Sequence, residues 1–532
     1  MTAVAADTAA ATKSKFPLLL TASLVSSLIM LDSNIVAVSL PAIGRSIGAT
    51  FTGIQWVISA YVLTYAALLL AAGNFADLHG RKRAMLLGLA IFAVASLGVG
   101  LSASATLLNL ARAAQGVGGA FLLTASLAII SHDFTGEART KAFAFWGASL
   151  GIALAIGPIL GGLITDTVGW RWVFLINLPL TAVLILATIK VVDESKDPDA
   201  KALDYGGIVT FSSGLAVLIW ALIDGSDAGW GSISVLARLA VAAALFAGFV
   251  VVELRKPHPM VDFALFRRPT FVGSVAAMIG YGASAQVMIF FLPQYLQNAY
   301  GFAPMTAGLA MIPFALPMVI APRVTSFLAL RFSGRALLVS GLGLTVIGNL
   351  AFWQVAKAHL HYPVFVVCML IAGCGAGLLN GQTVKVLGSA VPPERAGMAS
   401  GLASTTRFIG ILVAVAGLGA VLFNSVRSTF VGAATAAGLT PQAADAAAKR
   451  VTSGDLAGVL AGLPQAVRPA LHAAGLMAFA SGFAAAAAVA ACVAAVAAAL
   501  TFWLVRSVDT APPAPGTAGP VHCAAIDCRS PL

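Results

Sequence analysis

The sequence predicts an all-α integral membrane protein with fourteen transmembrane helices. Of its 532 residues, 59% are hydrophobic and only 10% are charged, whereas an ordinary soluble domain carries roughly 25% charged residues. The apolar residues gather in runs of ~20 residues or more, which is the length that a helix needs to cross a bilayer. The runs lack the apolar–polar alternation of a β-barrel strand, so we expect helices.

The expected spans follow one another with short gaps along almost the whole chain. They are residues 16–38, 54–75, 84–103, 106–130, 142–164, 172–192, 205–224, 233–253, 270–293, 304–326, 335–355, 363–386, 400–423 and 474–505. The first run is itself long enough to span, so no cleavable leader is expected. The net charge of +11 does not indicate nucleic-acid binding, because the basic residues lie in the gaps between runs rather than on one face.

Basic residues in the short gaps are divided unequally between the two sides of the membrane. One side carries fifteen: Arg81, Lys82, Arg83, Arg139, Lys141, Lys190, Lys196, Lys201, Arg255, Lys256, Arg267, Arg268, Arg331, Arg335 and Arg395. The other side carries three: Arg45, Arg171 and Lys357. The basic side is the cytoplasmic side, so we expect a multi-pass protein of the bacterial cytoplasmic membrane with both termini in the cytoplasm. Residues 424–471 are then a long outer loop, to which the charge rule does not apply.

Two gaps share a pattern that indicates an internal repeat. Asp77-Leu-His-Gly-Arg81 follows the second span, and Arg331-Phe-Ser-Gly-Arg335 follows the tenth. Repeated six-helix halves are a known plan of transporters, so the two spans between the halves would be an insertion. The expected organisation is a six-helix bundle in 1–195, two inserted helices with linkers in 196–262, a second six-helix bundle in 263–508 and a cytoplasmic tail in 509–532.

Asp32 lies inside the first span, where a carboxylate costs ~2.5–3.5 kcal/mol on insertion scales. Such a residue is a functional candidate by default, although a structural hydrogen bond to a neighbouring helix is the alternative. Arg112 in the fourth span is the expected partner, because both residues lie six residues from the outer edge of their spans, or ~9 Å. Gln115 is one turn from Arg112 and could share its face or simply bridge two helices.

Three further cations lie near apolar runs of the second half, where acidic residues are nearly absent from the spans. Lys385 and Arg407 lie near cytoplasmic ends, where long side chains extend to the interface, so we expect them to be anchors. Arg323 has no assigned role.

The fifth span contains Gly147, Gly151, Gly157-Pro158 and Gly161-Gly162. Glycines four residues apart let helices approach closely, and Pro158 removes one backbone hydrogen bond and kinks the helix. A tight, bendable helix contact suits a gate, whereas ordinary small-residue packing is the alternative.

Five motifs in order resemble those of the major facilitator superfamily, and in particular its drug:proton antiporters with fourteen spans. They begin at Leu31-Asp32, at Gly73-Asn-Phe-Ala-Asp77-Leu-His-Gly80-Arg81-Lys82, at Asn109-Leu-Ala-Arg112, at Gly147 and at Trp170-Arg-Trp. Leu78 stands where many members have arginine. The resemblance covers residues from about Leu18 to Arg506 and implies the major-facilitator fold of two six-helix bundles with two inserted helices.

The resemblance also implies roles for individual residues. Asp32 would be the proton-coupling carboxylate and Arg112 its modulator. Gly73, Asp77, Gly80 and Arg81 would form a conformational latch, with Asp133 as the partner of Arg81. The glycine–proline stretch would be the antiporter motif, which is rare in importers.

The predicted function is therefore proton-driven export of small lipophilic drugs or toxic compounds by alternating access. A lone Asp32 permits a cationic substrate but does not demand one. Dedicated export of an endogenous metabolite and, less in keeping with the antiporter motif, proton-coupled import of a nutrient are the alternatives. No selectivity-filter signature of a channel is visible in the sequence. No catalytic constellation is visible either, so we do not expect an enzyme.

The expected substrate cavity combines polar and aromatic residues of several spans: Asn34, Gln55, Trp56, Tyr61, Gln115, Gln286, Phe290, Asn380 and Gln382. The expected partners are the substrate, protons and lipid, with no cofactor and no resident metal. Cys523 and Cys528, with His522, match no zinc-binding pattern. The sequence does not predict an oligomeric state.

Overall fold

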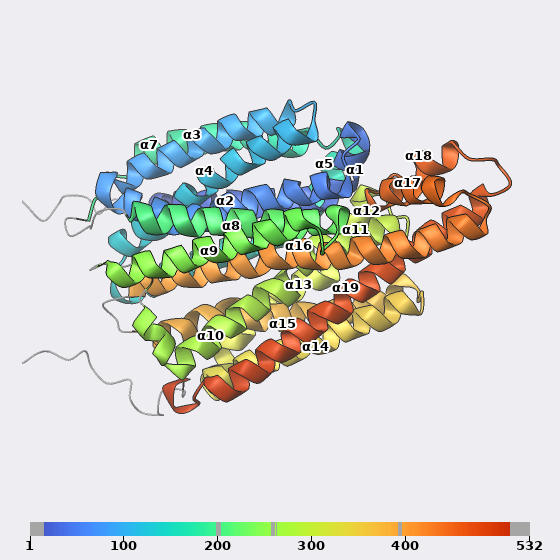
Figure 1. The fold of residues 1–532 in the computed structure, drawn as a ribbon. Helices are drawn as coiled ribbons and strands as arrows, with labels where there is room; N and C mark the ends of the chain where they lie inside the picture. Colours follow the sequence, from blue (N-terminus) through green and yellow to red (C-terminus); the bar gives the residue numbers. More distant parts are fainter. Residues whose placement is uncertain (1–14, 198–203, 257–260, 262, 392–395, 511–532) are drawn as a thin grey trace, which may run out of the picture.

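The computed structural model describes residues 15–197, 204–256, 261, 263–391 and 396–510. The tail residues His522, Cys523 and Cys528 therefore lie outside the described part. All regular elements of the described residues are helical (Figure 1).

The first half of the chain forms α1 (Phe16–Ile47), α2 (Phe51–His79), α3 (Arg81–Gly100), α4 (Ala105–Asp133), α5 (Gly136–Thr167), α6 (Trp172–Leu175) and α7 (Asn177–Val191). A hairpin follows, made of α8 (Tyr205–Ala228) and α9 (Ile233–Arg255). The second half forms η1 (Phe263–Arg267), α10 (Pro269–Gly280), the π-helix η2 (Tyr281–Gln286), α11 (Met288–Asn298), α12 (Pro304–Ala310), α13 (Ile312–Leu328), α14 (Gly334–Lys357), α15 (Tyr362–Ser389), α16 (Ala396–Ala436), α17 (Pro441–Thr452), α18 (Leu456–Ala461), α19 (Arg468–Leu504) and η4 (Val508–Thr510).

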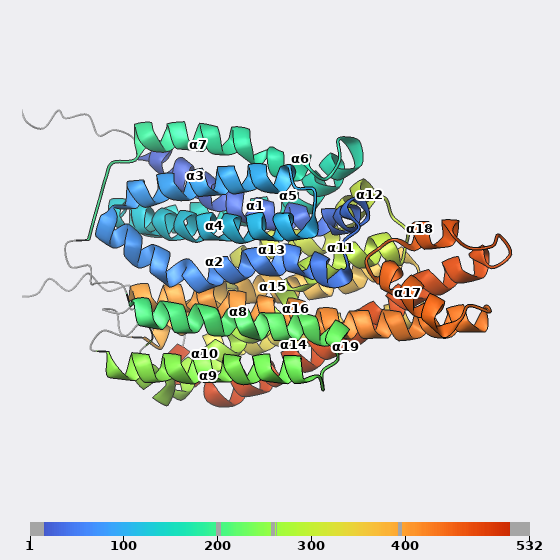
Figure 2. The ribbon, with the colours of Figure 1, turned by 45° about the horizontal axis from the view of Figure 1, so that its top comes forward.

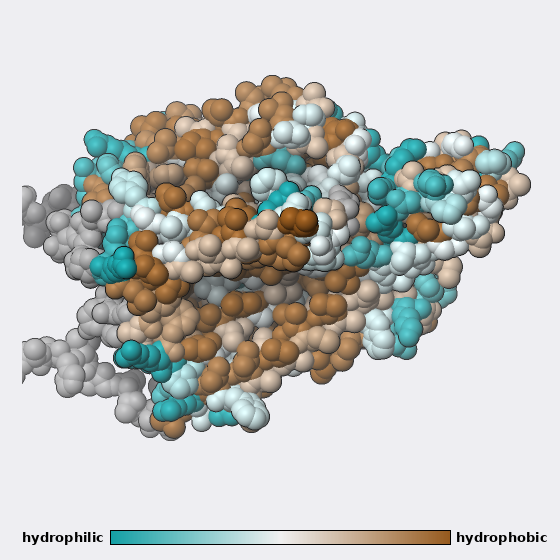
Figure 3. Space-filling view, viewed as in Figure 1, coloured by the Kyte–Doolittle hydropathy of each residue, from teal (hydrophilic) through white to brown (hydrophobic). Residues whose placement is uncertain are grey.

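Fourteen helical segments of the described chain are long and apolar enough to cross a membrane, which confirms the predicted fold class. Two of them are interrupted helices, α10–η2–α11 and α12–α13. Apolar side chains form a continuous band along the bundle, with polar residues at both ends (Figure 3). Because fourteen is an even number, the chain begins and ends on the same face, which we call the terminal face. The opposite end is the far face.

Several helices begin at a residue whose side chain caps the first turn. The hydroxyls of Thr50, Ser104, Ser232 and Ser333 each accept a hydrogen bond from the backbone N–H three residues further on. These bonds satisfy one of the free N–H groups that every helix start leaves.

The helices pack as two groups with the hairpin between them (Figures 1 and 2). In the first group, α1 packs on α5, α2 and α3 pack on α4, and α3 packs on α7. In the second group, α14 packs on α15 and α19, α13 on α15, and α16 on α19. Helix α8 packs against both α2 and α16, so the hairpin covers the junction where these two helices bring the groups together.

The base of the hairpin is held by polar contacts around Asp204. The Asp204 carboxylate accepts hydrogen bonds from the Gly207 N–H (2.9 Å) and from Lys256 Nζ (2.7 Å). Burial acts to raise the pKa of Asp204, but these hydrogen bonds outweigh it and lower the pKa below its ordinary value. Near the other end of the hairpin, Arg238 of α9 pairs with Asp224 of α8 and lies over the ring of Trp220.

The segment 424–471 is not the irregular loop that the sequence analysis anticipated. Helix α16 continues through Ala436, α17 and α18 follow, and α19 begins at Arg468. Figure 1 shows this helical extension projecting beyond the far face. An ion pair between Arg427 of α16 and Asp445 of α17 joins its parts.

The two groups meet closely in the half of the bundle near the far face. Gln297 of α11 donates to the carbonyl of Val38 in α1 (2.8 Å), and the rings of Phe51 (α2) and Phe423 (α16) stack with centroids 5.3 Å apart. A Cβ on Gly162 of α5 would lie 2.4 Å from the carbonyl oxygen of Pro304 in α12. The first described turns of the two groups are therefore locked together at the far face.

Candidate functional site

Asp32 lies in the middle of α1, and its side chain has no exposure. The helix is apolar around it, so the carboxylate is removed from both lipid and water. A buried charge of this kind is tolerated only when other groups supply the hydrogen bonds and the countercharge that water would have supplied.

Three side chains supply them. Arg112 Nη1 of α4 lies 2.6 Å from Asp32 Oδ2, and Gln115 Nε2, one turn further along α4, lies 2.9 Å from Oδ1. Asn177, at the start of α7, donates its Nδ2 to Oδ1 at 2.7 Å. Ser96 Oγ of α3 accepts from both Gln115 (2.9 Å) and Asn177 (3.4 Å). The structure thus brings Asp32 and Arg112 together, as their matching depths predicted.

The guanidinium of Arg112 is 1% exposed and fully engaged. Besides Asp32, it donates to the carbonyl of Val57 (Nε, 3.0 Å) and to Gln115 Oε1 (2.6 Å). Its Cζ lies 4.2 Å from the ring centroid of Tyr61 and 5.6 Å from that of Phe174. Protonation of Asp32 would remove the countercharge and leave Arg112 buried without an anion, so the pair can act as a two-state element.

Asn177 and Ser96 were missed as site residues by the sequence analysis. Asn177 stands in the Trp170-Arg-Trp stretch that carried part of the family resemblance. The available signal was a polar amide at the start of an apolar run. The proximity of α1, α4 and α7 was not readable from the sequence, so its partner could not be assigned.

The loop between α2 and α3 holds Arg81 against Asp77. Arg81 Nε and Nη2 lie 3.2 and 3.0 Å from Asp77 Oδ1. Asp133, the partner expected for Arg81, instead lies 3.7 Å from His132 Nδ1, and its carbonyl accepts from Lys15 Nζ at 2.6 Å. Both Arg81 and Asp133 are in the described part of the chain, and no ion pair joins them there. In this structure Arg81 therefore pairs with the acid one helical turn away and not with Asp133.

Glu194, which follows α7, is an additional member of this loop. Its carboxylate accepts from the backbone N–H groups of Lys82 (3.1 Å) and Arg83 (3.3 Å), at the positive end of α3. Gly80 has φ +118°, and a Cβ there would lie 2.4 Å from Glu194 Oε1, so this position requires glycine. Gly73 makes no such demand, because a Cβ there would be in ordinary contact with Thr124.

The glycine–proline stretch of α5 serves two helices. A Cβ on Gly157 would lie 2.6 Å from Asn34 Cβ, and one on Gly161 would lie 2.5 Å from the Ile35 carbonyl, so these two glycines admit α1. On the other face, Gly162 admits α12, and Pro158 is approached by Gly308 of α12.

Gly147 and Gly151 have open space around them, with nothing within 4 Å of a Cβ built on either. They precede Pro158 by three and two helical turns, so they continue the face of α5 that contacts α12. This face is packed near the far face and unpacked toward the terminal face, so only part of the expected tight contact is present in this conformation.

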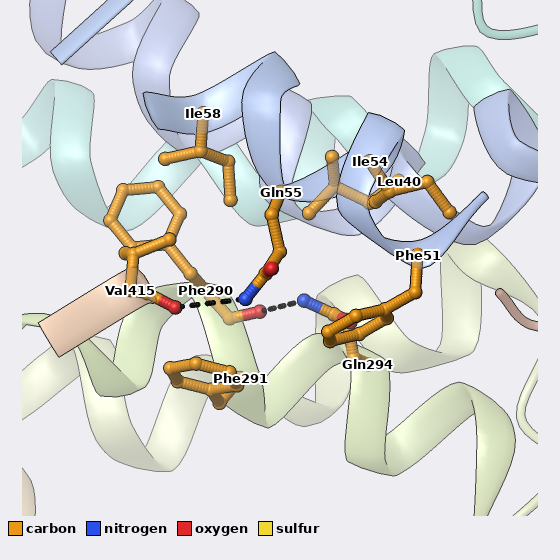
Figure 4. A pocket seen from close by; sticks show the side chains of 9 residues that line it. All are labelled: Leu40, Phe51, Ile54, Gln55, Ile58, Phe290, Phe291, Gln294 and Val415. Carbon is orange, nitrogen blue, oxygen red and sulfur yellow. Dashed lines mark hydrogen bonds between the residues drawn. The ribbon is translucent and has the colours of Figure 1, made fainter. Parts of the chain in front are cut away.

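The residues expected in the substrate cavity are dispersed. Gln55 and Phe290 line one small pocket between the groups (Figure 4). Gln115 and Tyr61 belong instead to the Asp32 site, and Asn34 lies at the contact between α1 and α5. Gln286 and Gln382 are buried, whereas Trp56 and Asn380 are half-buried.

The pocket lies where the groups meet in the far half of the bundle. Its lining also includes Leu40, Phe51, Ile54, Ile58, Phe291, Gln294 and Val415, none of which the sequence analysis named. Gln55 Nε2 donates to the carbonyl of Val415 (3.2 Å), and Gln294 Nε2 donates to that of Phe290 (3.0 Å), as Figure 4 shows. The two amides are therefore engaged with backbone in an otherwise apolar pocket.

Comparison with known proteins identifies the class to which this fold and this buried ion pair belong. Residues 22–415 match the sequence profile of the Major Facilitator Superfamily, so the chain belongs to that family. The expected family is therefore confirmed.

Several relatives carry names that refer to resistance or efflux. The chain is 36% identical over 397 residues to "Multidrug resistance protein Stp" of Mycobacterium tuberculosis (74% of this chain, 73% of the relative). It is 31% identical over 416 residues to the "Tetracenomycin C resistance and export protein" of Streptomyces glaucescens (78% and 77%). It is 33% identical over 427 residues to "Multidrug efflux pump LfrA" of Mycolicibacterium smegmatis (80% and 83%).

Solved structures share the fold at low sequence identity. A bacterial homologue of the human lysosomal transporter Spinster aligns with a TM-score of 0.65 at 17% identity, covering 94% of this chain and 100% of the other. A D-xylose–proton symporter aligns with a TM-score of 0.57 at 13% identity, covering 76% and 90%. At these identities the likeness concerns the fold alone.

Proposed function

We propose that this protein exports small lipophilic compounds across the bacterial cytoplasmic membrane in exchange for protons. The observation that carries the proposal is the fully buried Asp32, held by Arg112, Gln115 and Asn177 inside a membrane-spanning bundle. The relatives named for multidrug efflux and antibiotic export support the kind of cargo.

The proposed cycle rocks the two helix groups about the central region. The terminal face is taken as cytoplasmic, in keeping with its excess of Lys and Arg. Packing of the groups near the far face and the open α5 glycines near the terminal face suit a conformation that receives cargo from the cytoplasm. When a proton reaches Asp32, Arg112 loses its counterion, and this change favours rearrangement of α1 against α4.

The Asp77–Arg81 loop is proposed as the latch of the opposite conformation, in which the groups close at the terminal face. In the present conformation its groups are occupied by Glu194 and by each other. Asp133 stays a candidate partner of Arg81 only for that other conformation.

Everted membrane vesicles test the proposal. A lipophilic fluorescent dye should accumulate inside them when a proton gradient is imposed, and accumulation should collapse when an uncoupler is added. Asp32→Asn should abolish the response to the gradient, because the amide carries no titratable proton. Asp224→Asn is the matched control, since Asp224 is a membrane acid paired with Arg238 in the inserted hairpin.

Retention of gradient-driven accumulation in Asp32→Asn would remove Asp32 from the coupling role. Accumulation that ignores the uncoupler in the unmodified protein would contradict proton antiport itself.

Dedicated export of one compound is the second candidate, since one relative is named for tetracenomycin C and another as a probable actinorhodin transporter. A panel of structurally unrelated dyes separates the two. Transport of several dyes favours broad efflux, whereas transport of none alongside proton exchange driven by a single compound favours a dedicated exporter.

A further inference from the structure

Arg407 lies inside the membrane-spanning part of α16 without a countercharge. It is six residues from the start of the span at Gly401, or ~9 Å along the helix. Its Nε is buried and has no hydrogen-bond partner. Among the described residues its guanidinium forms no ion pair, and its ring contact is with the neighbouring Phe408, at 5.0 Å. The anchor role that the sequence analysis expected for Arg407 is therefore incorrect, because an anchor would direct its charge to the interface.

Two buried tyrosines surround this arginine, and the hydroxyl of each lacks a hydrogen-bond partner. Tyr65 of α2 is 1% exposed and Tyr281 of η2 is 0% exposed. The ring of Tyr65 meets that of Phe408 edge-on, with centroids 4.5 Å apart. Gly282, next to Tyr281, packs so closely on α16 that a Cβ there would lie 2.4 Å from the Arg407 carbonyl oxygen. Both hydroxyls are close enough to Arg407 to feel its charge.

The three unsatisfied donors come from both helix groups. Tyr65 belongs to the first group, and Arg407 and Tyr281 belong to the second. Tyr281 stands in a π-helix, a rare departure from α-helix geometry that is frequent at functional sites. Buried polar groups are nearly always hydrogen-bonded, so a cluster of three without partners indicates a site whose occupant is an acceptor.

The surrounding protein supplies no acid to neutralise Arg407. The sequence contains neither Asp nor Glu between positions 263 and 393, and none in the α16 span. The buried acid of the first group, Asp32, is already engaged with Arg112. The charge of Arg407 is thus available to a ligand, while the charge of Asp32 is not.

We propose that Arg407, with the hydroxyls of Tyr65 and Tyr281, binds an acidic oxygen group, a carboxylate or a phenolate, of the transported lipophilic compound. A guanidinium donates two parallel hydrogen bonds to such a group, and the hydroxyls donate one each. The parallel rings of Tyr61 and Tyr65, 6.0 Å apart between centroids, offer an aromatic surface beside it. This inference rests on the proposed export function and names its substrate class as anionic rather than cationic.

The site also touches the proton site. Tyr61 stacks on Tyr65 and at the same time lies over Arg112, with 4.2 Å between its ring centroid and Arg112 Cζ. A ligand that orders Tyr65 therefore presses on the residue that covers Arg112, and release of Arg112 from Asp32 acts on the ligand through the same two rings.

Binding of matched probes to the purified full-length protein in detergent tests the assignment. Pyrenebutyrate is the acid, pyrenebutyramide is its neutral analogue and pyrenylbutyl-trimethylammonium is the cation, and pyrene fluorescence reports binding of each. The protein should bind the acid at least about tenfold more tightly than the amide, the range expected for hydrogen bonds to a charged group. Arg407→Gln should bring that ratio to about one and leave amide binding unchanged.

Two conservative variants keep the test decisive if Arg407→Gln folds poorly. Tyr65→Phe and Tyr281→Phe each remove one unsatisfied oxygen, so each should lower the acid-to-amide ratio about threefold or more while the unfolding temperature stays equal or rises. Arg427→Gln is the control on the same helix, because Arg427 already pairs with Asp445. It should leave the ratio unchanged.

An unchanged ratio in Arg407→Gln would overturn the proposal, and so would a full ratio in both tyrosine variants when Arg407→Gln loses all probes together. Displacement of the acid by short-chain phosphatidylglycerol, but not by excess unlabelled butyrate-bearing aromatic acids, would assign the site to a lipid headgroup and also overturn it.

The proposed export function fails or stands separately. If everted vesicles accumulate the cationic probe with protons while the purified protein does not prefer the acid, export stands and the anion site is wrong. If the acid is preferred through Arg407 but no probe moves with the proton gradient, the anion site stands and proton-driven export is wrong.

Discussion

At the scale of single residues, the Asp32 site is a closed set of complementary groups. The carboxylate has two oxygens; Oδ2 accepts from Arg112, and Oδ1 accepts from Gln115 and Asn177. Ser96 in turn fixes the two amides from α3. Each amide orientation is determined by its neighbours, because the same group cannot donate to Asp32 and to Ser96 in any other rotamer arrangement of these contacts.

Asn177 is predicted to matter because Asp32 is charged. Asn177→Leu should lower the free energy of unfolding by about 1–3 kcal/mol, the cost of removing one donor from a buried charged acceptor. In the Asp32→Asn background the same substitution should cost less, because the acceptor is then neutral. Thermal unfolding of the four proteins of this double-mutant cycle, in one detergent, measures the difference.

Asn109→Leu is the matched control for that cycle. Asn109 donates to the carbonyl of Gly53 (3.2 Å), a neutral acceptor. Its effect should be the same with Asp32 or with the amide in place. Equal costs of Asn177→Leu in both backgrounds would show that Asn177 contributes packing alone.

At the scale of elements, α5 is the helix that meets both groups. Its Gly157 and Gly161 admit α1 of its own group, and Gly162 admits α12 of the other group. Pro158 lies between these contacts, where it removes a backbone hydrogen bond and allows the helix to bend. The glycines that lie toward the terminal face, Gly147 and Gly151, face open space. They are free to receive a neighbour when the groups close at that end.

Gly162→Val should prevent the closed contact near the far face. A valine Cβ would lie 2.4 Å from the Pro304 carbonyl, closer than real Cβ atoms come. A cysteine introduced at Ile54, in the pocket lining, should then react with a membrane-impermeant thiol reagent from outside far faster than in the unmodified background. All five native cysteines are replaced by alanine in both proteins.

Gly151→Val is the control for this experiment, since it adds the same side chain on the same helix where space is open. It should leave the reaction at Ile54→Cys slow. Equal reaction rates in the two variants would mean that the contact of α5 with α12 does not close the far face.

At the scale of the whole molecule, three features give the bundle its asymmetry. The groups are joined near the far face, the α8–α9 hairpin covers the junction of α2 with α16, and the helical extension formed by α16, α17 and α18 projects beyond the far face. The contact of α5 with α12 and α13 is on a different junction, which the hairpin does not contact strongly. Movement of the groups would therefore be freest on the α5 side.

The charge of the cargo should decide how strongly transport responds to voltage. Exchange of a proton for an anion moves one charge more than exchange for a neutral compound, and exchange for a cation moves one less. Each charge contributes ~2.3 kcal/mol per 100 mV. Proteoliposomes with a potassium diffusion potential and no pH gradient should therefore show the largest stimulation for pyrenebutyrate, less for pyrenebutyramide and least for the cation.

The order of the three probes is the diagnostic result, because it does not depend on the number of protons per cycle. A reversed order would contradict proton antiport, whereas identical stimulation would indicate that cargo charge does not cross the membrane with the cargo.

The sequence alone determined the fourteen spans, the family and the pairing of Asp32 with Arg112. These follow from properties that are local in the chain: the length of apolar runs, the motifs, and the depth of a charge within its span, which restricts the partners it can meet. Gln115 could be anticipated in the same way, because a helix places residues three apart on one face.

Only the tertiary structure decided which side chains complete each site. Asn177 reaches Asp32, Glu194 covers Gly80, and Arg407 stands beside Tyr65 and Tyr281 because helices far apart in the sequence pack together. The partner of Arg81 and the open space at Gly147 depend in addition on which conformation the two groups adopt. Span length and composition are the same in every such arrangement, so they carry no information about it.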